Sequence, residues 1–168
     1  TMYGGNGADT FILRAGDGSS ILANADVIAD FQNGADVIGM DGLSFDDLTI
    51  SQGTNSNASH TIIQYTSTGE YLAIIQNTAV GNITALDFTS TSTDAQTLTG
   101  TSGNNTLIGG AGVDTVNGDT GSDTVYSWGG NDTINITGKS GVFTDTINGG
   151  AGTDTLNINY NGVTSLRD

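Results

Sequence analysis

The sequence contains neither cysteine nor proline, and only three of its 168 residues are basic. Because cysteine is absent, disulfides contribute nothing to stability, and thiolate metal or redox sites are excluded. Eighteen acidic side chains bring the formal net charge to −15, which disfavours a polyanionic nucleic acid as a partner. With 35% hydrophobic residues, the chain can build only a modest core for its length.

Signals of catalysis and membrane insertion are missing as well. No run approaches the roughly 20 apolar residues of a transmembrane helix, and the N-terminus lacks the charged and hydrophobic regions of a signal peptide. His60 is the only histidine, so a zinc-protease H-E-x-x-H site is excluded, and we expect His60 to be an ordinary strand residue. Acids line the glycine-rich loops and no G-K-[ST] follows them, which disfavours phosphate binding. We therefore expect no enzymatic activity in this chain.

Glycine, by contrast, is abundant, and many of the 26 glycines lie in the pattern G-G-x-G-x-D-x-U-x, where U is a large apolar residue. Complete and partial copies begin at Gly4, Gly100, Gly109, Gly118, Ser127 and Gly149. The nine-residue period breaks across Ile136 to Thr144 and resumes at Asp145. Such a period marks a repeated structural unit that buries its apolar side chains only by stacking on its neighbours.

The residue types predict the geometry of each copy. Glycines at the first, second and fourth positions permit a tight loop that exposes its carbonyl groups. The last three residues, Thr-U-x, suit a short strand whose apolar side chain points inward. These inward residues are Phe11, Leu107, Val116, Val125, Ile134, Ile147 and Leu156. The strand threonines, and Asn117, Asn135, Asn148 and Asn157 beside them, are expected to form ladders along one face of the wound chain.

The sixth position of each copy carries a carboxylate, or an amide at Asn105. A wound chain stacks these acids, and their repulsion favours a cation between them. Carbonyl and carboxylate oxygens in an irregular cage are ligands that Ca²⁺ accepts. The stacked acids are Asp9, Asp114, Asp123, Asp132, Asp145 and Asp154. If on the order of five ions bind, about ten negative charges are offset, and the chain without calcium is expected to be expanded or unfolded.

These nonapeptides resemble those of RTX (repeats-in-toxin) proteins, whose repeats form a calcium-binding parallel β-roll. The resemblance implies that Ca²⁺ lies between successive turns, held by carbonyls of the second and fourth positions and by the sixth-position side chain. Asp119 and Trp128 replace second-position glycines, but a carbonyl ligand needs no particular side chain. The implied ligands are Gly5, Gly7, Asp9, Asn105, Gly110, Gly112, Asp114, Asp119, Gly121, Asp123, Trp128, Gly130, Asp132, Asp145, Gly150, Gly152 and Asp154.

A second resemblance covers Asp26 to Ile38, which reads D-V-I-A-D-F-Q-N-G-A-D-V-I. This segment is similar to the one that ends the β-roll in the C-terminal domain of serralysin-type secreted metalloproteases. The resemblance implies that Asp30, directly before Phe31, closes the last calcium site of the preceding roll. Asp26 and Asp36 are either part of this arrangement or caps of turns.

The middle of the chain loses the repeat and gains longer alternating runs. Leu48 to Ile50, His60 to Tyr65 and Tyr71 to Ile75 predict strands, with a hairpin turn over residues 66–70. A β-sheet here would cap the open end of a roll. We therefore expect an all-β chain in which residues 1–90 form a roll end with a β cap, residues 91–99 a linker and residues 100–168 a second β-roll.

Three functional hypotheses follow. The first is a calcium-dependent structural module of a secreted protein that folds after export, as in substrates of bacterial type I secretion. The second is an adhesive or surface-layer module that contacts glycans, ice or another cell, with Tyr126 and Trp128 as candidate contacts. The third is the non-catalytic portion of a secreted hydrolase. The chain opens inside a repeat, which predicts a piece of a longer protein, and we expect the isolated piece to be a monomer.

Overall fold

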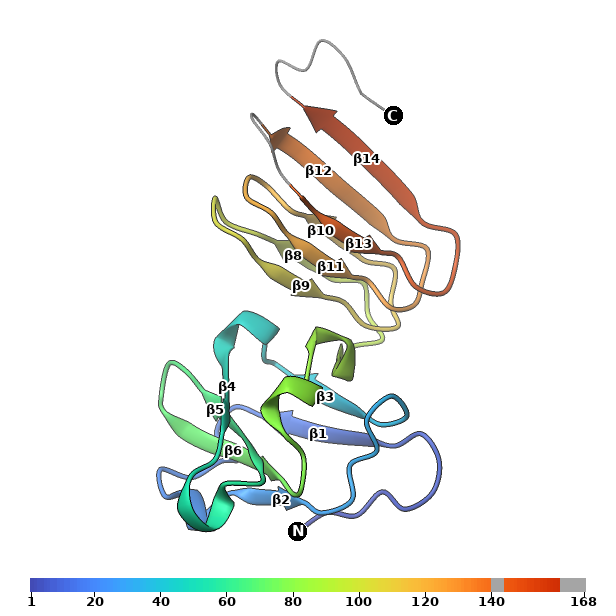
Figure 1. The fold of residues 1–168 in the computed structure, drawn as a ribbon. Coiled ribbons are helices and arrows are strands. Elements are labelled where there is room, and N and C mark those ends of the chain that lie inside the picture. Colours follow the sequence, from blue (N-terminus) through green and yellow to red (C-terminus); the bar gives the residue numbers. More distant parts are fainter. Residues whose placement is uncertain (140–143, 161–168) are drawn as a thin grey trace. The chain divides into compact units, whose positions relative to one another are not determined.

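The computed structural model describes residues 1–139 and 144–160 and divides the chain into two compact units, Thr1–Thr91 and Ser92–Asp168 (Figure 1). Over the described ranges every helical element is a 3-10 turn of three residues, which confirms the all-β prediction. None of these helices is long or apolar enough to cross a membrane. The turns are η1 (Leu22–Asn24), η2 (Phe45–Asp47), η3 (Asn55–Asn57), η4 (Val80–Asn82) and η5 (Ala85–Asp87).

The first unit begins with a loosely wound coil. Its parallel sheet has the order β1-β3-β7, formed by β1 (Thr10–Arg14), β3 (Val37–Asp41) and β7 (Phe88–Ser90). Thr10 pairs with Val37, and Met2 forms a parallel bridge with Ile28. One turn of this coil is therefore longer than two nonapeptides, because residues 15–25 are inserted between β1 and the next strand, which begins at Asp26.

The second sheet of this unit has the order β2-β6-β5-β4. It comprises β2 (Asp26–Ile28), β4 (Leu48–Gln52), β5 (Thr61–Tyr65) and β6 (Glu70–Ile75). Strands β4, β5 and β6 are antiparallel neighbours, whereas β2 joins β6 in parallel. The predicted strands and the hairpin turn are confirmed, but the prediction that His60 is a strand residue was wrong. His60 lies directly before β5, where its Nδ1 accepts the N–H of Asn77.

Strands of both sheets of the first unit contribute to its apolar core. The fully buried large apolar side chains are Ile28, Ile38, Met40, Ile63, Ile75 and Phe88. Full burial of such a side chain contributes about 1.5–3 kcal/mol, so this core is a substantial source of stability.

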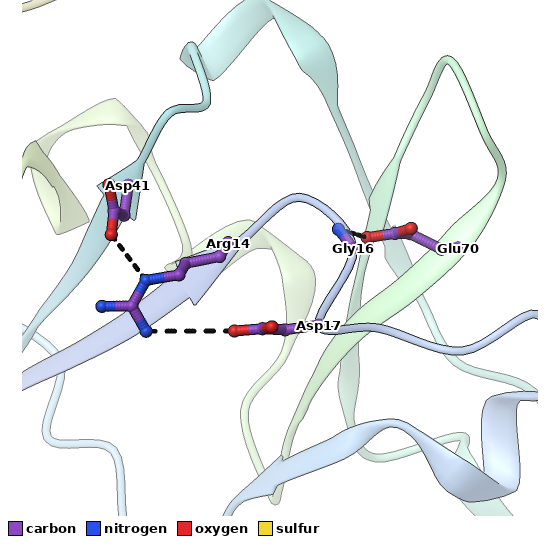
Figure 2. Close-up of polar contacts among 5 residues, drawn as sticks. All are labelled: Arg14, Gly16, Asp17, Asp41 and Glu70. Carbon is purple, nitrogen blue, oxygen red and sulfur yellow. Dashed lines mark hydrogen bonds and ion pairs between the residues drawn. The ribbon is translucent and has the colours of Figure 1, made fainter.

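Polar contacts hold the surface of the same unit (Figure 2). Arg14 Nε donates to Asp41 Oδ2 over 2.5 Å and so links the ends of β1 and β3. Asp17 Oδ2 lies 3.9 Å from Arg14 Nη1. The Gly16 N–H donates to Glu70 Oε1 over 2.7 Å. Because the Arg14 and Asp41 side chains are about half exposed, this ion pair contributes at most about 1 kcal/mol.

The second unit is a parallel β-roll of two sheets, with orders β8-β10-β12-β14 and β9-β11-β13 (Figure 1). Successive strands alternate between the sheets, so residues two nonapeptides apart are paired, as in Thr97, Thr115 and Thr133. The strands are β8 (Thr97–Thr99), β9 (Thr106–Ile108), β10 (Thr115–Asn117), β11 (Thr124–Tyr126), β12 (Thr133–Lys139), β13 (Thr146–Asn148) and β14 (Thr155–Tyr160).

The interior of the roll is narrow. Val116, Val125, Ile134 and Ile136 are buried between the sheets, with Leu98, Leu107 and Ile147 packed partly against them. The inward prediction is thus confirmed for the central copies. Leu156 differs, because it is 47% exposed, and Ile158 beside it is 55% exposed. Both lie on β14, which pairs with β12 and stands at the edge of the sheet order.

The break in the period does not end the roll. Thr124 pairs with Thr146 and Thr133 with Thr155, so the break adds four residues to one coil and leaves the pairing of both sheets intact. Strands β12 and β14 lengthen and pair beyond the usual three residues, through Ile136 with Ile158 and Thr137 with Asn159. Residues 140–143 and 161–168, the rest of the predicted second roll, lie outside the described residues.

Two details of the sequence interpretation were wrong. Thr97 to Thr99 was assigned to the linker, but forms β8 and pairs with β10. Its nonapeptide, Thr91 to Thr99, has neither glycines nor the sixth-position acid. The sequence pattern therefore did not identify it as a copy of the repeat, although its strand forms. The threonines do not form one ladder, because alternation of the copies divides them between two sheets, and Thr10 pairs with Val37 in the first unit.

Candidate calcium-binding site

The loops of the roll stack along its two edges. We call residues 92–96, 109–114, 127–132 and 149–154 edge 1, and residues 100–105, 118–123 and 144–145 edge 2. On edge 1, the N–H groups of Ala111, Gly129 and Ala151 donate to the carbonyls of Ser92, Gly110 and Trp128, respectively. Each loop is thereby fixed to the loop one coil earlier.

A ladder of sixth-position side chains follows each edge, as the sequence predicts. On edge 1, Asp132 Oδ1 accepts the N–H of Asp114 over 2.8 Å, and Asp154 Oδ1 accepts that of Asp132 over 3.0 Å. On edge 2, Asp123 Oδ1 accepts the N–H of Asn105, and Asp145 Oδ1 accepts that of Asp123. Each acid therefore commits one oxygen to the neighbouring coil, and the acids are stacked one coil apart.

Some of the second carboxylate oxygens, Oδ2, of these acids are deeply buried. Asp114 and Asp132 are each 1% exposed. Over the described ranges, Asp9 Oδ2 and Asp132 Oδ2 are buried without any hydrogen-bond partner. An anionic oxygen in this situation carries a large desolvation cost unless a cation compensates it.

The electrostatics of Asp132 agree with this geometry. Burial raises the pKa of the Asp132 carboxyl above its ordinary value, and the negative charges of Asp114 and Asp154 raise it further. The hydrogen bond from the Asp114 N–H acts in the opposite direction and lowers this pKa. A cation beside Asp132 would stabilise the ionised form that burial and its neighbours disfavour.

The second and fourth loop positions adopt the left-handed backbone conformation in most copies. Asp119 and Trp128, which replace second-position glycines, have φ of 59° and 68°. Left-handed φ costs a non-glycine residue roughly 1–2 kcal/mol, so the loop imposes its geometry on these residues. The predicted carbonyl donors with positive φ are Gly5, Gly7, Asp119, Gly121, Trp128, Gly130, Gly150 and Gly152.

Carbonyl oxygens of one coil project against the glycines of the next. A Cβ on Gly130 would collide with the carbonyl oxygen of Gly112, and one on Gly152 with that of Gly130. Likewise, a Cβ on Gly150 would collide with the carbonyl oxygen of Trp128. The space between the loops is therefore bordered by carbonyls of the predicted ligand positions, and the glycines keep it clear of side chains.

The first turn of edge 1 departs from this pattern. Gly110 and Gly112 stack on the carbonyls of Ser92 and Asp94, but they do not have positive φ. Gln96 holds the sixth position of that turn, and its N–H donates to Asp114 Oδ1 over 2.8 Å. Because Gln96 is not an acid, a calcium site between this turn and the loop of residues 109–114 would have only one sixth-position carboxylate, that of Asp114. The predicted ligands Gly110 and Gly112 belong to the same loop as Asp114. Asn105 places an amide at the same point of edge 2, where its Oδ1 accepts the N–H of Thr101.

The first unit brings Asp9 and Asp30 to one loop. Asp30 Oδ1 and Oδ2 accept the N–H groups of Gly4 and Gly5, each over 2.9 Å. Gln32 Nε2 donates to the carbonyl of Gly5, so one lone pair of this predicted ligand is already engaged. Asp30 therefore lies against the first nonapeptide loop, as the resemblance implies, and whether it binds Ca²⁺ there stays a prediction.

Sequence reasoning did not identify Asp36 as a ladder residue. Asp36 Oδ1 accepts the Asp9 N–H over 3.1 Å, and Asp36 Oδ2 accepts the N–H of Gln32 over 2.8 Å. It thus continues the ladder and also caps a turn, the two alternatives left open above. The signal was present, since Asp36-Val37-Ile38 repeats the D-x-U end of a nonapeptide. Gln96 was hidden because the copy around it, Thr91 to Thr99, contains no glycine.

The residues present fit Ca²⁺. Within the described ranges, some buried carboxylate oxygens have no hydrogen-bond partner, and glycines keep the loop carbonyls clear of side chains. Hard oxygen ligands of this kind suit Ca²⁺. Nowhere in the described part of the chain do three or more His, Cys, Asp or Glu side chains gather as a metal cluster. A site here would therefore depend on main-chain carbonyls as much as on acids. Bound Ca²⁺ would supply charge compensation and a cross-link between coils.

Comparison with known families agrees with this chemistry. The profile of the RTX calcium-binding nonapeptide repeat, which spans four copies, matches residues 92–125, 99–134 and 141–157. The profile of the peptidase M10 serralysin C-terminal domain matches residues 2–99, more than half of the chain. A search of curated proteins gave no match. The chain belongs to the serralysin-type M10 C-terminal family and carries RTX repeats, which makes it a calcium-binding structural module of a secreted protein.

Proposed function

We propose that this module folds its roll when Ca²⁺ binds, so that it passes through export as an unfolded chain and becomes rigid outside the cell. The observation that carries this proposal is the buried ladder of edge 1. In it, Asp114, Asp132 and Asp154 are stacked one coil apart, and Asp132 Oδ2 has no partner among the described residues. Ions that bind only the folded roll shift the folding equilibrium towards it.

The net negative charge of the chain also supports calcium-coupled folding. Eighteen acids against three basic residues repel one another, and the repulsion is strongest where acids of adjacent coils are held together. In a calcium-poor cytosol this repulsion opposes folding of the roll. Where calcium is millimolar, binding compensates the charge. The proposal uses the affinity expected of extracellular modules, about 0.1–1 mM.

The test is a far-UV circular dichroism titration of the full chain with Ca²⁺, with Mg²⁺ as the control. We expect a cooperative gain of β signal with Ca²⁺ near ~0.1–1 mM, and little with Mg²⁺, which demands octahedral geometry and retains its water. A spectrum that is already complete in chelator, and unchanged by Ca²⁺, would contradict calcium-coupled folding.

The serralysin-type match also supports the hypothesis that the module accompanies a secreted hydrolase without taking part in its chemistry. The single histidine agrees with this, because a zinc-protease motif needs two. The chain supplied with both Ca²⁺ and Zn²⁺ is expected to hydrolyse casein no faster than buffer does. Metal-dependent hydrolysis by the purified chain would refute this assignment.

A further inference from the structure

The loop of residues 127–132 on edge 1 differs from the complete copies at its first position. Complete copies have glycine there, but this copy has Ser127. Ser127 is 0% exposed, and over the described ranges its Oγ has no hydrogen-bond partner. A buried hydroxyl without a partner costs about 1–3 kcal/mol, and glycine at this position would avoid the cost.

The repeat geometry shows what a first-position side chain faces. A Cβ built on Gly4 lies 2.7 Å from Asp9 Oδ2, and one built on Gly109 lies 2.5 Å from Asp114 Oδ2. The first-position Cβ therefore points at the second carboxylate oxygen of its own copy. In the loop of Ser127 that oxygen is Asp132 Oδ2, which is itself buried and without a hydrogen-bond partner among the described residues.

Two buried oxygens of one loop, a hydroxyl and a carboxylate oxygen, thus lack hydrogen-bond partners among the residues that the structure describes. They therefore do not form a hydrogen bond with each other. A cation coordinated by both oxygens would compensate for their missing hydrogen bonds. Ca²⁺ takes six to eight oxygen ligands in flexible geometry. The carbonyl oxygens of Trp128 and Gly130 in the same loop project against Gly150 and Gly152 of the next loop.

We propose that the Ser127 hydroxyl is an additional, side-chain ligand of the ion held by the loop of residues 127–132, so that this ion keeps one water fewer than the ions of the glycine-first copies. The proposal rests on the proposed function, because it requires that a Ca²⁺ site exists at Asp132. It gives this site a ligand that the nonapeptide pattern does not contain.

Trp128 provides a local readout, since it is the only tryptophan and lies next to Ser127. Tb³⁺ serves as the probe, because it occupies oxygen sites and its luminescence is sensitised through tryptophan. Emission decay in H₂O and D₂O gives the number of water molecules on the ion. The full chain is compared with Ser127→Gly, Ser127→Ala and the control Ser102→Ala, an exposed third-position serine on edge 2.

We expect both Ser127 variants to raise the number of bound waters by about one and to weaken Tb³⁺ binding at Trp128 roughly threefold to tenfold, with Ser102→Ala unchanged. Ser127→Gly restores the residue of the complete copies, so a folding defect does not obscure its result. Equal hydration in all four proteins would overturn the proposal and assign Ser127 Oγ to a buried water. No tryptophan-sensitised Tb³⁺ signal in the unmodified chain would overturn it by removing the site itself.

Discussion

The two units wind the same kind of coil but derive their stability from different sources. The first winds a long coil with an insertion between its strands and buries six large apolar side chains completely. The second winds a tight coil of two nonapeptides and buries about one apolar side chain per strand. The tight coil leaves room for little besides loops, so its acids and carbonyls are brought together while its hydrophobic core stays small.

The loops show the corresponding difference. In the first unit, Asp30 and Asp36 direct both of their oxygens to backbone N–H groups, and only Asp9 Oδ2 is buried without a hydrogen-bond partner among the described residues of that unit. In the second, Asp132 directs one oxygen to the backbone and keeps the other buried without a partner among the described residues. A coil that satisfies most of its loop acids through its own backbone depends less on a metal than one that does not. We therefore expect calcium dependence to be concentrated in the roll of the second unit.

The substitution with the largest expected effect is Asp132→Asn. It removes the charge at the centre of the edge 1 ladder and keeps the shape of the side chain. The calcium midpoint of folding should rise at least about tenfold, which equals about 1.4 kcal/mol. Circular dichroism titrations measure it, with Asp17→Asn in the first unit as the exposed control. Equal midpoints for the two variants would remove Asp132 from the site.

A smaller effect is expected from filling the space between two loops. Gly130→Ala places a methyl group against the Gly112 carbonyl at φ 119°. Gly138→Ala meets no atom closer than 3.8 Å at φ 77°, so it isolates the backbone strain. We expect Gly138→Ala to cost about 1–2 kcal/mol of unfolding free energy, and Gly130→Ala to cost more and also to raise the calcium midpoint. A shared calcium midpoint would show that the carbonyl of Gly112 is not needed.

The effect of pH on the stability of the folded roll should reverse when calcium is added. The pKa of Asp132 is raised in the folded roll, so its contribution to stability is present at low pH and is lost as pH rises through that pKa. In metal-stripped buffer, the β signal of the roll should be larger near pH 4 than near pH 7, where the roll without calcium is expected to be unfolded. With saturating Ca²⁺ the order should invert, because protons compete with the ion. The same pH trend with and without Ca²⁺ would separate Asp132 from the metal.

The sequence predicted the repeat, the alternation of loop and strand, and the stacked acids, because a nine-residue period constrains neighbouring copies equally. It did not predict β8, whose copy has no glycine, or the ladder role of Asp36, whose copy keeps only the fourth-position Gly34. It also merged the threonines into one ladder, because composition does not reveal that successive copies change sheets. The exposure of Leu156 depends on neighbouring coils, which no single copy encodes.

The most direct test of this contrast is hydrogen exchange of the full chain, resolved by peptide, in chelator and in millimolar Ca²⁺. We predict that peptides covering β10, β11 and β12 exchange freely in chelator and become strongly protected with Ca²⁺. Peptides covering β3, β5 and β6 should be protected in both conditions. Equal protection of the β10 to β12 peptides with and without Ca²⁺ would contradict the account, because it would mean that the narrow roll is stable without its ions.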